Sequence, residues 1–323
     1  MIKILQGNCI DKIKELDDNS IDCVVSSPPY FGLRDYGVDG QFGLEKTYHD
    51  YLANTVKVFE TFKPKLKDTA TIWWNVGDSY HNYRPTNNKQ GMYKKPDYPK
   101  QSIAGNRQDL PKHSLKRNQR YQEIKEKDLM MIPNRVAIAL QDAGWYIRSE
   151  IIWHKPNPMP ESVRDRPTSC HEKIWLITKN KKYYYDHEAI KEPAKDWGTR
   201  NRKKGSAFVD ATPGRSKQTG GKDCNFAEKG RNKRNVWTIT TKPFKDAHFA
   251  TFPKDLIEPC IKAGCPEGGI VLDPFGGSGT TGIVAALNNR KSILIELNKD
   301  YIDIANKRID KEVGLFNENI SSL

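Results

Sequence analysis

The chain lacks the long apolar runs that membrane proteins need. None of its stretches approaches the ~18 apolar residues of a membrane span, and only 37% of its 323 residues are hydrophobic. Its mean hydropathy of -0.76 is low for a compact globule, so we expect some segments to be exposed. Residues 1–6 also lack the apolar core of a signal peptide. These absences argue against a membrane protein and favour the cytoplasm.

Cysteine is sparse, and its spacing excludes the usual metal motifs. The chain has six cysteines and no CxxC pair; they lie at positions 9, 23, 170, 224, 260 and 265. Cys260 and Cys265 have no second pair that would complete a zinc site. We therefore expect free, buried thiols and no metal site.

Acidic residues are too few to balance the basic ones, and the excess is localised. The chain has 53 Lys and Arg against 40 Asp and Glu, a net charge of +13. Residues 81–122 hold ten basic and two acidic residues, and residues 199–234 hold eleven and three, so each segment carries +8. Charge segregated in this way is typical of proteins that bind polyanions, and it favours a nucleic acid.

Alternating strand and helix patterns predict an α/β protein. It opens with a strand, a helix and a strand at 2–6, 9–16 and 21–25, which is typical of a parallel sheet. Further helices are expected at 47–66, 129–143, 253–263 and 280–287, and further strands at 70–78, 145–153, 236–239, 270–272 and 292–295. The segments 174–178 and 182–185 are expected to pair as a hairpin across 179–181.

The first candidate site follows the apolar run 21–25. The sequence there is Ser-Ser-Pro-Pro-Tyr, residues 26–30. Consecutive prolines fix φ, donate no amide hydrogen and bias the preceding residue away from helix. The turn therefore brings together a hydroxyl, free carbonyls and an aromatic ring, which can orient an exocyclic amine and stack on its base. Taken alone, the motif also fits a rigid loop that closes a strand.

The second candidate site is a glycine loop near the carboxyl end. Gly277, Gly279 and Gly282 follow a predicted strand and open a predicted helix, and Glu296 ends the next strand. This is the context of a nucleotide-cofactor site, in which glycines admit the cofactor and the acid accepts hydrogen bonds from the ribose. Asp273 precedes the glycines. Its carboxylate would repel a pyrophosphate but suits a cationic amino-acid group, which favours S-adenosylmethionine over NAD.

Together the two motifs resemble the permuted β class of DNA amino-methyltransferases. In that family a [DNS]-P-P-[YFW] turn precedes the glycine loop; here residues 27–30 match the turn and residues 273–281 match the loop. Residues 248–253 resemble the cofactor segment upstream of the loop. Residues 74–78 and 152–157 resemble the motifs that line the target-base pocket.

The resemblance implies a doubly wound, mostly parallel Rossmann-like sheet, circularly permuted, with inserted basic DNA-binding segments. Its implied parts are a catalytic half at 1–80 and 123–185, a basic insertion at 81–122, a target-recognition region at 186–234, a cofactor half at 235–315 and a tail at 316–323.

The resemblance also implies roles for individual residues. The catalytic residues would be Ser27, Pro28, Pro29 and Tyr30. The residues that bind S-adenosylmethionine would be Asn8, Phe252, Asp273, Pro274, Phe275, Gly277, Ser278, Gly279, Thr280, Thr281 and Glu296. The target-base pocket would contain Asn75, Asp78, Trp153 and Lys155, and the DNA contacts would be Arg200, Arg202, Lys203, Lys204, Arg231, Lys233 and Arg234. Asn8 departs from the family, which often has an acid there.

The implied activity is methylation of a base amine in double-stranded DNA, with the target nucleotide flipped out of the duplex. The amine attacks directly, so no cysteine nucleophile is required. A serine in the first position of the turn is usual for cytosine N4, and adenine N6 is the alternative. A nucleic-acid-binding protein without catalysis and an NAD-dependent oxidoreductase are the competing classes. A cognate restriction endonuclease and a homodimer are partners that the sequence leaves open.

Overall fold

The computed structural model describes residues 1–33, 37–81, 124–193, 230–241 and 252–314. The predicted basic insertion and most of the second basic segment lie outside these ranges. Within them the strands are β1 (Ile2–Gln6), β2 (Ile21–Ser26), β3 (Leu66–Val76), β4 (Tyr146–His154), β5 (His171–Thr178), β6 (Val236–Thr238), β7 (Ile270–Asp273) and β8 (Lys291–Glu296). The α-helices are α1 (Cys9–Lys14), α2 (Tyr48–Phe62), α3 (Ile132–Asp142), α5 (Lys254–Gly264), α6 (Thr280–Leu287) and α7 (Lys299–Val313).

The described strands form one eight-stranded sheet in the order β1-β8-β7-β2-β3-β5-β4-β6. Every neighbouring pair is parallel except the two pairs that involve β5, which runs antiparallel to β3 and to β4. The sheet is therefore mostly parallel, as the sequence predicts.

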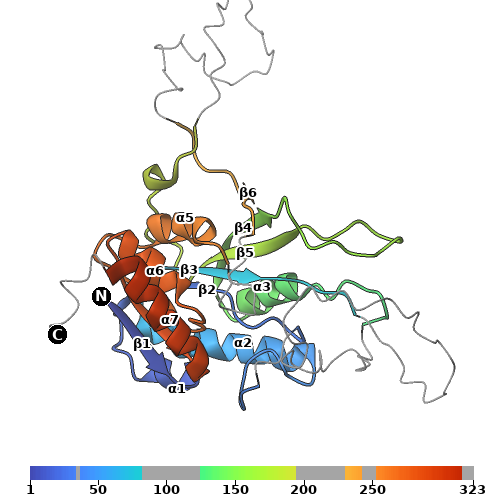
Figure 1. The fold of residues 1–323 in the computed structure, drawn as a ribbon, viewed down its shortest axis with the longest axis horizontal. Helices are drawn as coiled ribbons and strands as arrows, with labels where there is room; N and C mark the ends of the chain where they lie inside the picture. The colour runs from blue at the N-terminus through green and yellow to red at the C-terminus, as the bar shows by residue number, and fades with distance from the viewer. Residues whose placement is uncertain (34–36, 82–123, 194–229, 242–251, 315–323) are drawn as a thin grey trace, which may run out of the picture.

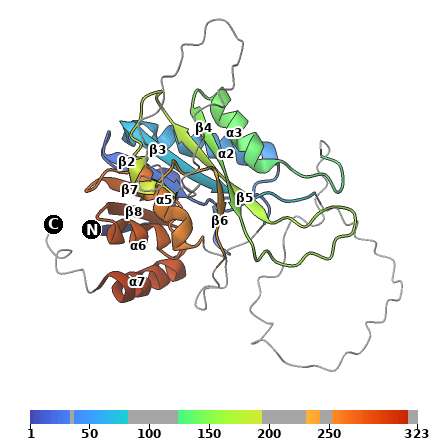
Figure 2. The same cartoon turned by 90° about the horizontal axis from the view of Figure 1, so that it is seen from above.

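Helices cover both faces of this sheet, so its central strands are apolar on both sides. Adjacent residues of β3 show the alternation. Trp74 packs in the cluster that contains α1, α2 and α3, whereas Trp73 packs in the cluster that contains α5. Figures 1 and 2 show α5, α6 and α7 gathered on one side of the sheet and α2 and α3 on the other. This is the doubly wound arrangement of Rossmann-like folds.

The strand order brings the two ends of the chain together in one sheet, which agrees with the permuted order that the resemblance implies. The first strand pairs with the last, with Ile2 opposite Ser292, and Figure 1 shows blue β1 among the orange and red elements of the other chain end. At the centre, β2 pairs with β7, with Val24 opposite Leu272. Because parallel neighbours end at the same edge, the segments after β2 and β7 emerge side by side. In α/β sheets such an edge is where ligands bind.

Local sequence explains where helix α2 begins. Thr47 accepts a hydrogen bond from the Asp50 amide, and the Asp50 carboxylate accepts one from the Thr47 amide, which forms a capping box. Pro64 lies in a short 3-10 turn (Lys63–Lys65) that ends the helical segment before β3. The predicted helix 47–66 therefore corresponds to α2 and this turn.

Two sequence expectations differ from the structure. The predicted hairpin between 174–178 and 182–185 is wrong, because β5 has β3 on one side and β4 on the other and has no free edge. Residues 182–185 form no strand; the Tyr184 amide instead donates to the Thr69 carbonyl at 2.8 Å. Helix α7 was not expected at all.

No helix of the described part of the chain is long and apolar enough to cross a membrane.

The contact between α5 and the sheet gives a stability prediction at Gly264. A Cβ atom there would lie 2.3 Å from both Thr71 Oγ1 and Trp73 Nε1, in the buried core. Overpacking of this kind costs about 2 kcal/mol, so Gly264→Ala should lower the free energy of unfolding by that amount in urea titrations. Gly314→Ala is the matched control, because no atom lies within 4 Å of its added Cβ. Equal effects of the two substitutions would contradict the packing argument.

Candidate active site

A buried carboxylate joins the two segments that the sequence analysis singles out. Asp273 ends β7 and is 1% exposed. Its Oδ1 accepts a hydrogen bond from Ser26 Oγ at 2.6 Å and one from the Phe275 amide at 3.0 Å. Its Oδ2 accepts from Thr281 Oγ1 at 2.6 Å. The acid that we expected to face a cationic cofactor group therefore ties β2 to β7 and to the first turn of α6.

Burial also changes the acidity of this group. Removal from water disfavours the charged form, and it raises the pKa of the Asp273 carboxyl from 3.8 to about 6, against the opposing effect of its hydrogen bonds. In this fully buried position, the three hydrogen-bond donors stabilise the ionised form of Asp273.

The glycine loop, residues 273–281, is buried except at two positions. Phe275 and Gly277 are partly exposed, and the other residues of the loop are buried. Gly277 has φ +48°, and the nearest atom to an added Cβ is the Phe275 carbonyl oxygen at 3.9 Å. Its open backbone is where a ligand can approach. Gly279, with φ +80°, serves helix packing instead. Its Cβ would lie 3.0 Å from Ala305 of α7, so the absence of a side chain allows that helix to pack on the loop.

Arg308 of α7 holds the same loop from the other side, and sequence reasoning missed it. Its Nη1 donates to the Ser278 carbonyl at 2.7 Å, to Ser278 Oγ at 2.8 Å and to Thr280 Oγ1 at 2.9 Å. The signal was present, because Ala305, Ile309 and Val313 recur at helical spacing. Ser278 and Thr280, expected as cofactor ligands, therefore use their hydroxyls to bind this guanidinium.

Glu296 lies beside the loop, at the end of β8. Its Oε2 accepts from the Gly277 amide at 2.8 Å, and its Oε1 accepts from the Asn298 amide at 2.8 Å. Burial raises the pKa of this carboxyl. A carboxylate has about four lone-pair sites, so each oxygen keeps a place for a further donor. With the open backbone of Gly277, this set fits the ribose of a nucleoside cofactor.

The remaining four expected cofactor residues each have a defined place in the structure. Asn8 caps α1 by accepting from the Ile10 amide at 2.9 Å. Phe252 precedes α5 and packs against the cluster on that face of the sheet. The Phe275 ring contacts the Phe42 ring in a tilted arrangement, with centroids 5.3 Å apart. Pro274 is buried in the turn that follows β7.

The Pro-Pro turn, residues 27–30, follows β2 directly. The Tyr51 hydroxyl donates to the Pro29 carbonyl at 3.3 Å, and Gly43 packs closely on the same turn, where a Cβ atom would lie 3.0 Å from the Tyr30 carbonyl. Pro28 is buried, and Ser27 is partly exposed. Packing from α2 and from the loop before it therefore holds the turn rigidly at the sheet edge.

A network of polar side chains meets at the Tyr30 hydroxyl. This oxygen lies 2.6 Å from Glu172 Oε2, 3.1 Å from Asn75 Oδ1 and 3.2 Å from Ser27 Oγ. Burial, and then the neighbouring Glu172 carboxylate, raises the pKa of the Tyr30 phenol well above its ordinary range. The phenol therefore keeps its proton.

Glu172 was not among the predicted site residues. It is the second residue of β5, and the antiparallel direction of that strand brings its beginning to the edge where β3 and β4 end. Its other oxygen, Oε1, accepts a hydrogen bond from Lys155. A sequence pattern identifies a strand but does not give its direction, so the sequence did not show at which edge of the sheet this acid lies.

The other expected pocket residues have structural partners. Asn75 Nδ2 donates to the Lys173 carbonyl at 3.2 Å. Asp78 Oδ1 accepts from the Ile132 amide at 3.1 Å, at the start of α3. Trp153 is 4% exposed and donates to the Ile239 carbonyl at 2.8 Å. Asn75 thus reaches the Tyr30 network, whereas Trp153 supports it from the core beneath Lys155.

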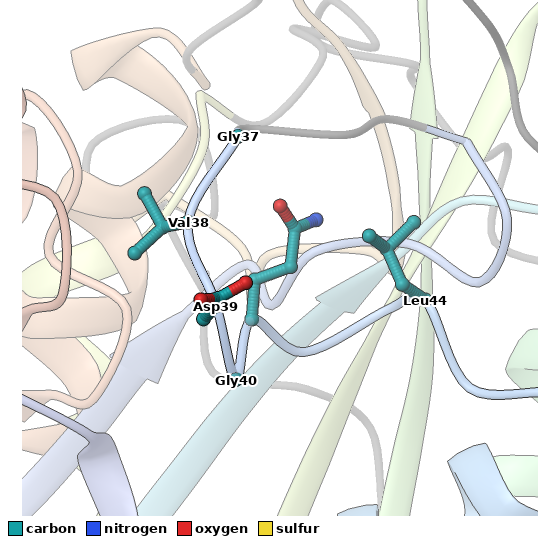
Figure 3. Close-up of a pocket in the computed structure, with 6 residues that line it drawn as sticks. Gly37, Val38, Asp39, Gly40 and Leu44 are labelled. Atoms are coloured by element: carbon teal, nitrogen blue, oxygen red, sulfur yellow. The ribbon is translucent and has the colours of Figure 1, made fainter.

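A cavity of about 360 Å³ lies in the loop that follows the Pro-Pro turn. Its lining consists of Gly37, Val38, Asp39, Gly40, Gln41 and Leu44. Figure 3 shows Val38 and Leu44 on opposite sides of the hollow with Asp39 between them. The Gly32 amide donates to the Gly43 carbonyl at 2.8 Å, which holds this loop against the turn.

Three of the expected DNA contacts lie in the described residues. Arg231 and Arg234 both donate to Glu192 Oε1, at 2.9 and 2.6 Å. Lys233 Nζ lies 5.1 Å from the centroid of the Trp237 ring. Arg200, Arg202, Lys203 and Lys204 lie outside the described residues.

A doubly wound sheet in which a glycine loop and a rigid polar turn meet at one edge is the architecture of Rossmann-like methyltransferases. A profile of the N6/N4 DNA methylase family matches residues 21–307, nearly the whole chain. The chain belongs to this family and is a DNA methyltransferase.

Relatives and solved structures agree with this assignment. The chain is 42% identical to the type II methyltransferase M.Cfr9I of Citrobacter freundii over 311 residues, covering 96% of this chain and 88% of that protein. It is also 42% identical to the type II methyltransferase M.SmaI of Serratia marcescens over 307 residues, covering 95% of this chain and 90% of that one.

The fold is shared with two more distant proteins. The cytosine-N4-specific PvuII DNA methyltransferase superposes with a TM-score of 0.62 at 18% identity, over 99% of this chain and 88% of that one. A DNA modification methylase of Thermus thermophilus, solved with S-adenosyl-L-methionine, gives a TM-score of 0.56 at 19% identity, over 97% of this chain and 96% of that one.

The packing of Tyr30 on Gly77 predicts a loss of activity without a loss of cofactor binding. A Cβ atom at Gly77 would lie 2.4 Å from Tyr30 Cε2. Gly77→Ala should displace the ring and lower single-turnover methyl transfer at least about tenfold, since small misplacements of catalytic groups have effects of that size or larger. Affinity for the methyl donor, measured by calorimetry, should stay within twofold of wild type. Unchanged turnover would contradict the close packing.

The raised pKa of Asp273 predicts a specific pH dependence of stability. The folded state binds this proton more tightly than the unfolded state, so the contribution of this group is most favourable below pH 3.8 and is lost as pH rises to about 6. The loss amounts to about 3 kcal/mol. Urea titrations from pH 4 to pH 8 should show wild type losing stability relative to Asp273→Asn up to pH 6, and a constant difference above pH 7. A difference that stays constant from pH 4 would contradict the shift.

Proposed function

We propose that this chain transfers a methyl group from S-adenosylmethionine to the exocyclic N4 amine of a cytosine flipped out of double-stranded DNA. The observation that supports it best is the hydrogen bond from Ser26 to Asp273, which fixes the Pro-Pro turn next to the glycine loop. A hydroxyl and carbonyls that can accept from an amine thus stand beside the glycine loop.

The chain's own residues would hold the cofactor at the glycine loop. The backbone at Gly277 and the remaining lone pairs of Glu296 suit the ribose, and Asn8 and Phe252 are proposed contacts for the adenine. The glycine loop, fixed by Arg308 and Asp273, sets the position of the methionine end. When bound, S-adenosylmethionine supplies an electrophilic methyl group.

The Pro-Pro turn would orient the nucleophile. Ser27 Oγ and the Pro28 carbonyl accept hydrogen bonds from the two amine hydrogens, which directs the nitrogen lone pair out of the ring plane. Tyr30 packs against the base. Most of the rate enhancement then comes from the fixed orientation of the two reacting groups, which can contribute several powers of ten.

The choice of cytosine N4 over adenine N6 rests on Ser27, because a serine in this position is the usual form for N4 enzymes of the family. The turn itself offers the same acceptors to either amine. Lys and Arg of the two basic segments would contact DNA phosphates, which positions the protein without reading the sequence. The type II relatives suggest a cognate restriction endonuclease as a functional companion.

The product identifies the reaction and the base. Protein is incubated with labelled S-adenosylmethionine and mixed-sequence DNA, the DNA is digested to nucleosides, and mass spectrometry identifies the methylated one. N4-methylcytosine is expected. N6-methyladenine would overturn the base assignment and leave the rest in place, and absence of any methylated nucleoside would overturn the proposed reaction.

Ser27→Ala tests the hydrogen-bonding role in the same assay. Removal of one well-placed polar contact in an active site typically costs about 10²-fold in rate, and we expect a loss of that order with intact cofactor binding. Ser149→Ala is the matched control; its hydroxyl contacts only the neighbouring Glu150 carbonyl, at 3.4 Å, among the contacts of the described chain. Full activity of Ser27→Ala would contradict the role.

A further inference from the structure

The neighbours of the Tyr30 hydroxyl determine which atom accepts its proton. Glu172 Oε2 lies 2.6 Å away and Asn75 Oδ1 lies 3.1 Å away. The Asn75 amide is oriented by its own bond, because Nδ2 donates to the Lys173 carbonyl at 3.2 Å. Both of these neighbours are therefore acceptors. A phenol has one proton, and the shorter contact with the charged carboxylate is the stronger bond.

The direction of the Tyr30 hydrogen bond determines the direction of the hydrogen bond between Ser27 and Tyr30. The Ser27 hydroxyl lies 3.2 Å from the Tyr30 oxygen, whose proton is already given to Glu172. The hydrogen bond between them can therefore form only with Ser27 as the donor. Once its single proton points at Tyr30, Ser27 Oγ has only lone pairs to offer on its remaining side.

Lys155 fixes the orientation of the Glu172 carboxylate, which is the first acceptor in this series of hydrogen bonds. Its ammonium donates to Glu172 Oε1, so that Oε2 is the oxygen that faces Tyr30. The two side chains are only 19% and 16% exposed. Lys155 Nζ also lies 4.4 Å from the centroid of the buried Trp153 ring. Water therefore competes weakly for these bonds, and each partner has one arrangement.

We propose that Glu172 is a specificity-determining positioning residue: through Tyr30 it makes Ser27 an obligate hydrogen-bond acceptor. An obligate acceptor binds an exocyclic amine and rejects a carbonyl at the same ring position. The site thereby selects cytosine over uracil or thymine, or adenine over hypoxanthine. The inference rests on the proposed function, since it assumes an amine substrate, but it holds for either amine.

Glu172→Gln tests this direction while it keeps the size of the side chain. A glutamine whose oxygen accepts from Lys155 presents its NH₂ group to Tyr30, so the phenol loses its strongest acceptor. Its proton is then shared between Asn75 Oδ1 and Ser27 Oγ, which lie at similar distances. Whenever Ser27 accepts this proton, its own proton turns into the pocket. We expect single-turnover methyl transfer to fall about 30-fold, with affinity for the methyl donor within twofold of wild type. Glu150→Gln is the matched control, because Glu150 pairs with Lys173 on the same two strands and does not contact Tyr30.

A double-mutant cycle separates this role from a structural one. Tyr30→Phe removes the link between Glu172 and Ser27, so Glu172→Gln should cost less than twofold in that background. A 30-fold loss in both backgrounds would show that Glu172 acts by another route and would overturn the proposal. Unfolding midpoints of all variants establish that each one folds.

Binding provides the readout that packing alone would not change. Wild type should bind a duplex with the target cytosine at least tenfold more tightly than one with uracil at that position. In Glu172→Gln this ratio should fall below threefold, and comparison of ratios between enzymes cancels the energy of opening each duplex. If the product is N6-methyladenine, hypoxanthine replaces uracil. If wild type is active and Glu172→Gln keeps the wild-type binding ratio, the inference is wrong. If wild type itself transfers no methyl group, the proposed function is wrong.

Discussion

The carboxylate of Asp273 is the constraint on which the site depends. A charged group that is 1% exposed is tolerated only when donors surround it, and the three donors come from Ser26, Phe275 and Thr281. Ser26 and Asp273 are 247 positions apart in the chain. Their bond makes the end of β2 and the beginning of the glycine loop one rigid unit. Because methyl transfer requires two reactants at a fixed distance, a single buried ion is an efficient way to couple the two halves.

The antiparallel strand β5 is the second constraint. A fully parallel sheet would place only carboxyl-terminal strand ends at the functional edge. Reversal of one strand places an amino-terminal end there as well, and Glu172 arrives with it. Lys155, which follows β4, meets this acid from the neighbouring strand. The pair that supports Tyr30 therefore results from topology, and neither residue belongs to the Pro-Pro turn or to the glycine loop.

Much of the fold could be predicted from the sequence because its signals are local. Apolar runs before residues 26 and 273, two prolines and a row of glycines identify strands and turns without any knowledge of distant contacts. The direction of β5 could not be predicted in this way, since antiparallel pairing depends on which strand lies next to it. For the same reason Glu172 was missed, and Arg308 was missed with α7. Asp273 was identified as important, but its hydrogen bonds to Ser26 and Thr281 depend on strand order and could not be predicted from local sequence.

What the first residue of the Pro-Pro turn requires from its neighbours depends on whether it is an aspartate or a serine. An aspartate there accepts hydrogen bonds whatever its neighbours do, because an ionised carboxylate has no proton to give. A serine both donates and accepts, and a free hydroxyl would bind an amine and a carbonyl almost equally well. A serine-type turn therefore needs a neighbour that takes up the serine proton. In this chain Tyr30 takes it up, and the Lys155–Glu172 pair keeps the Tyr30 proton turned away from Ser27. The contribution of Ser27 to specificity for an amine thus depends on charges outside the motif itself, whereas the Pro28 carbonyl can only accept.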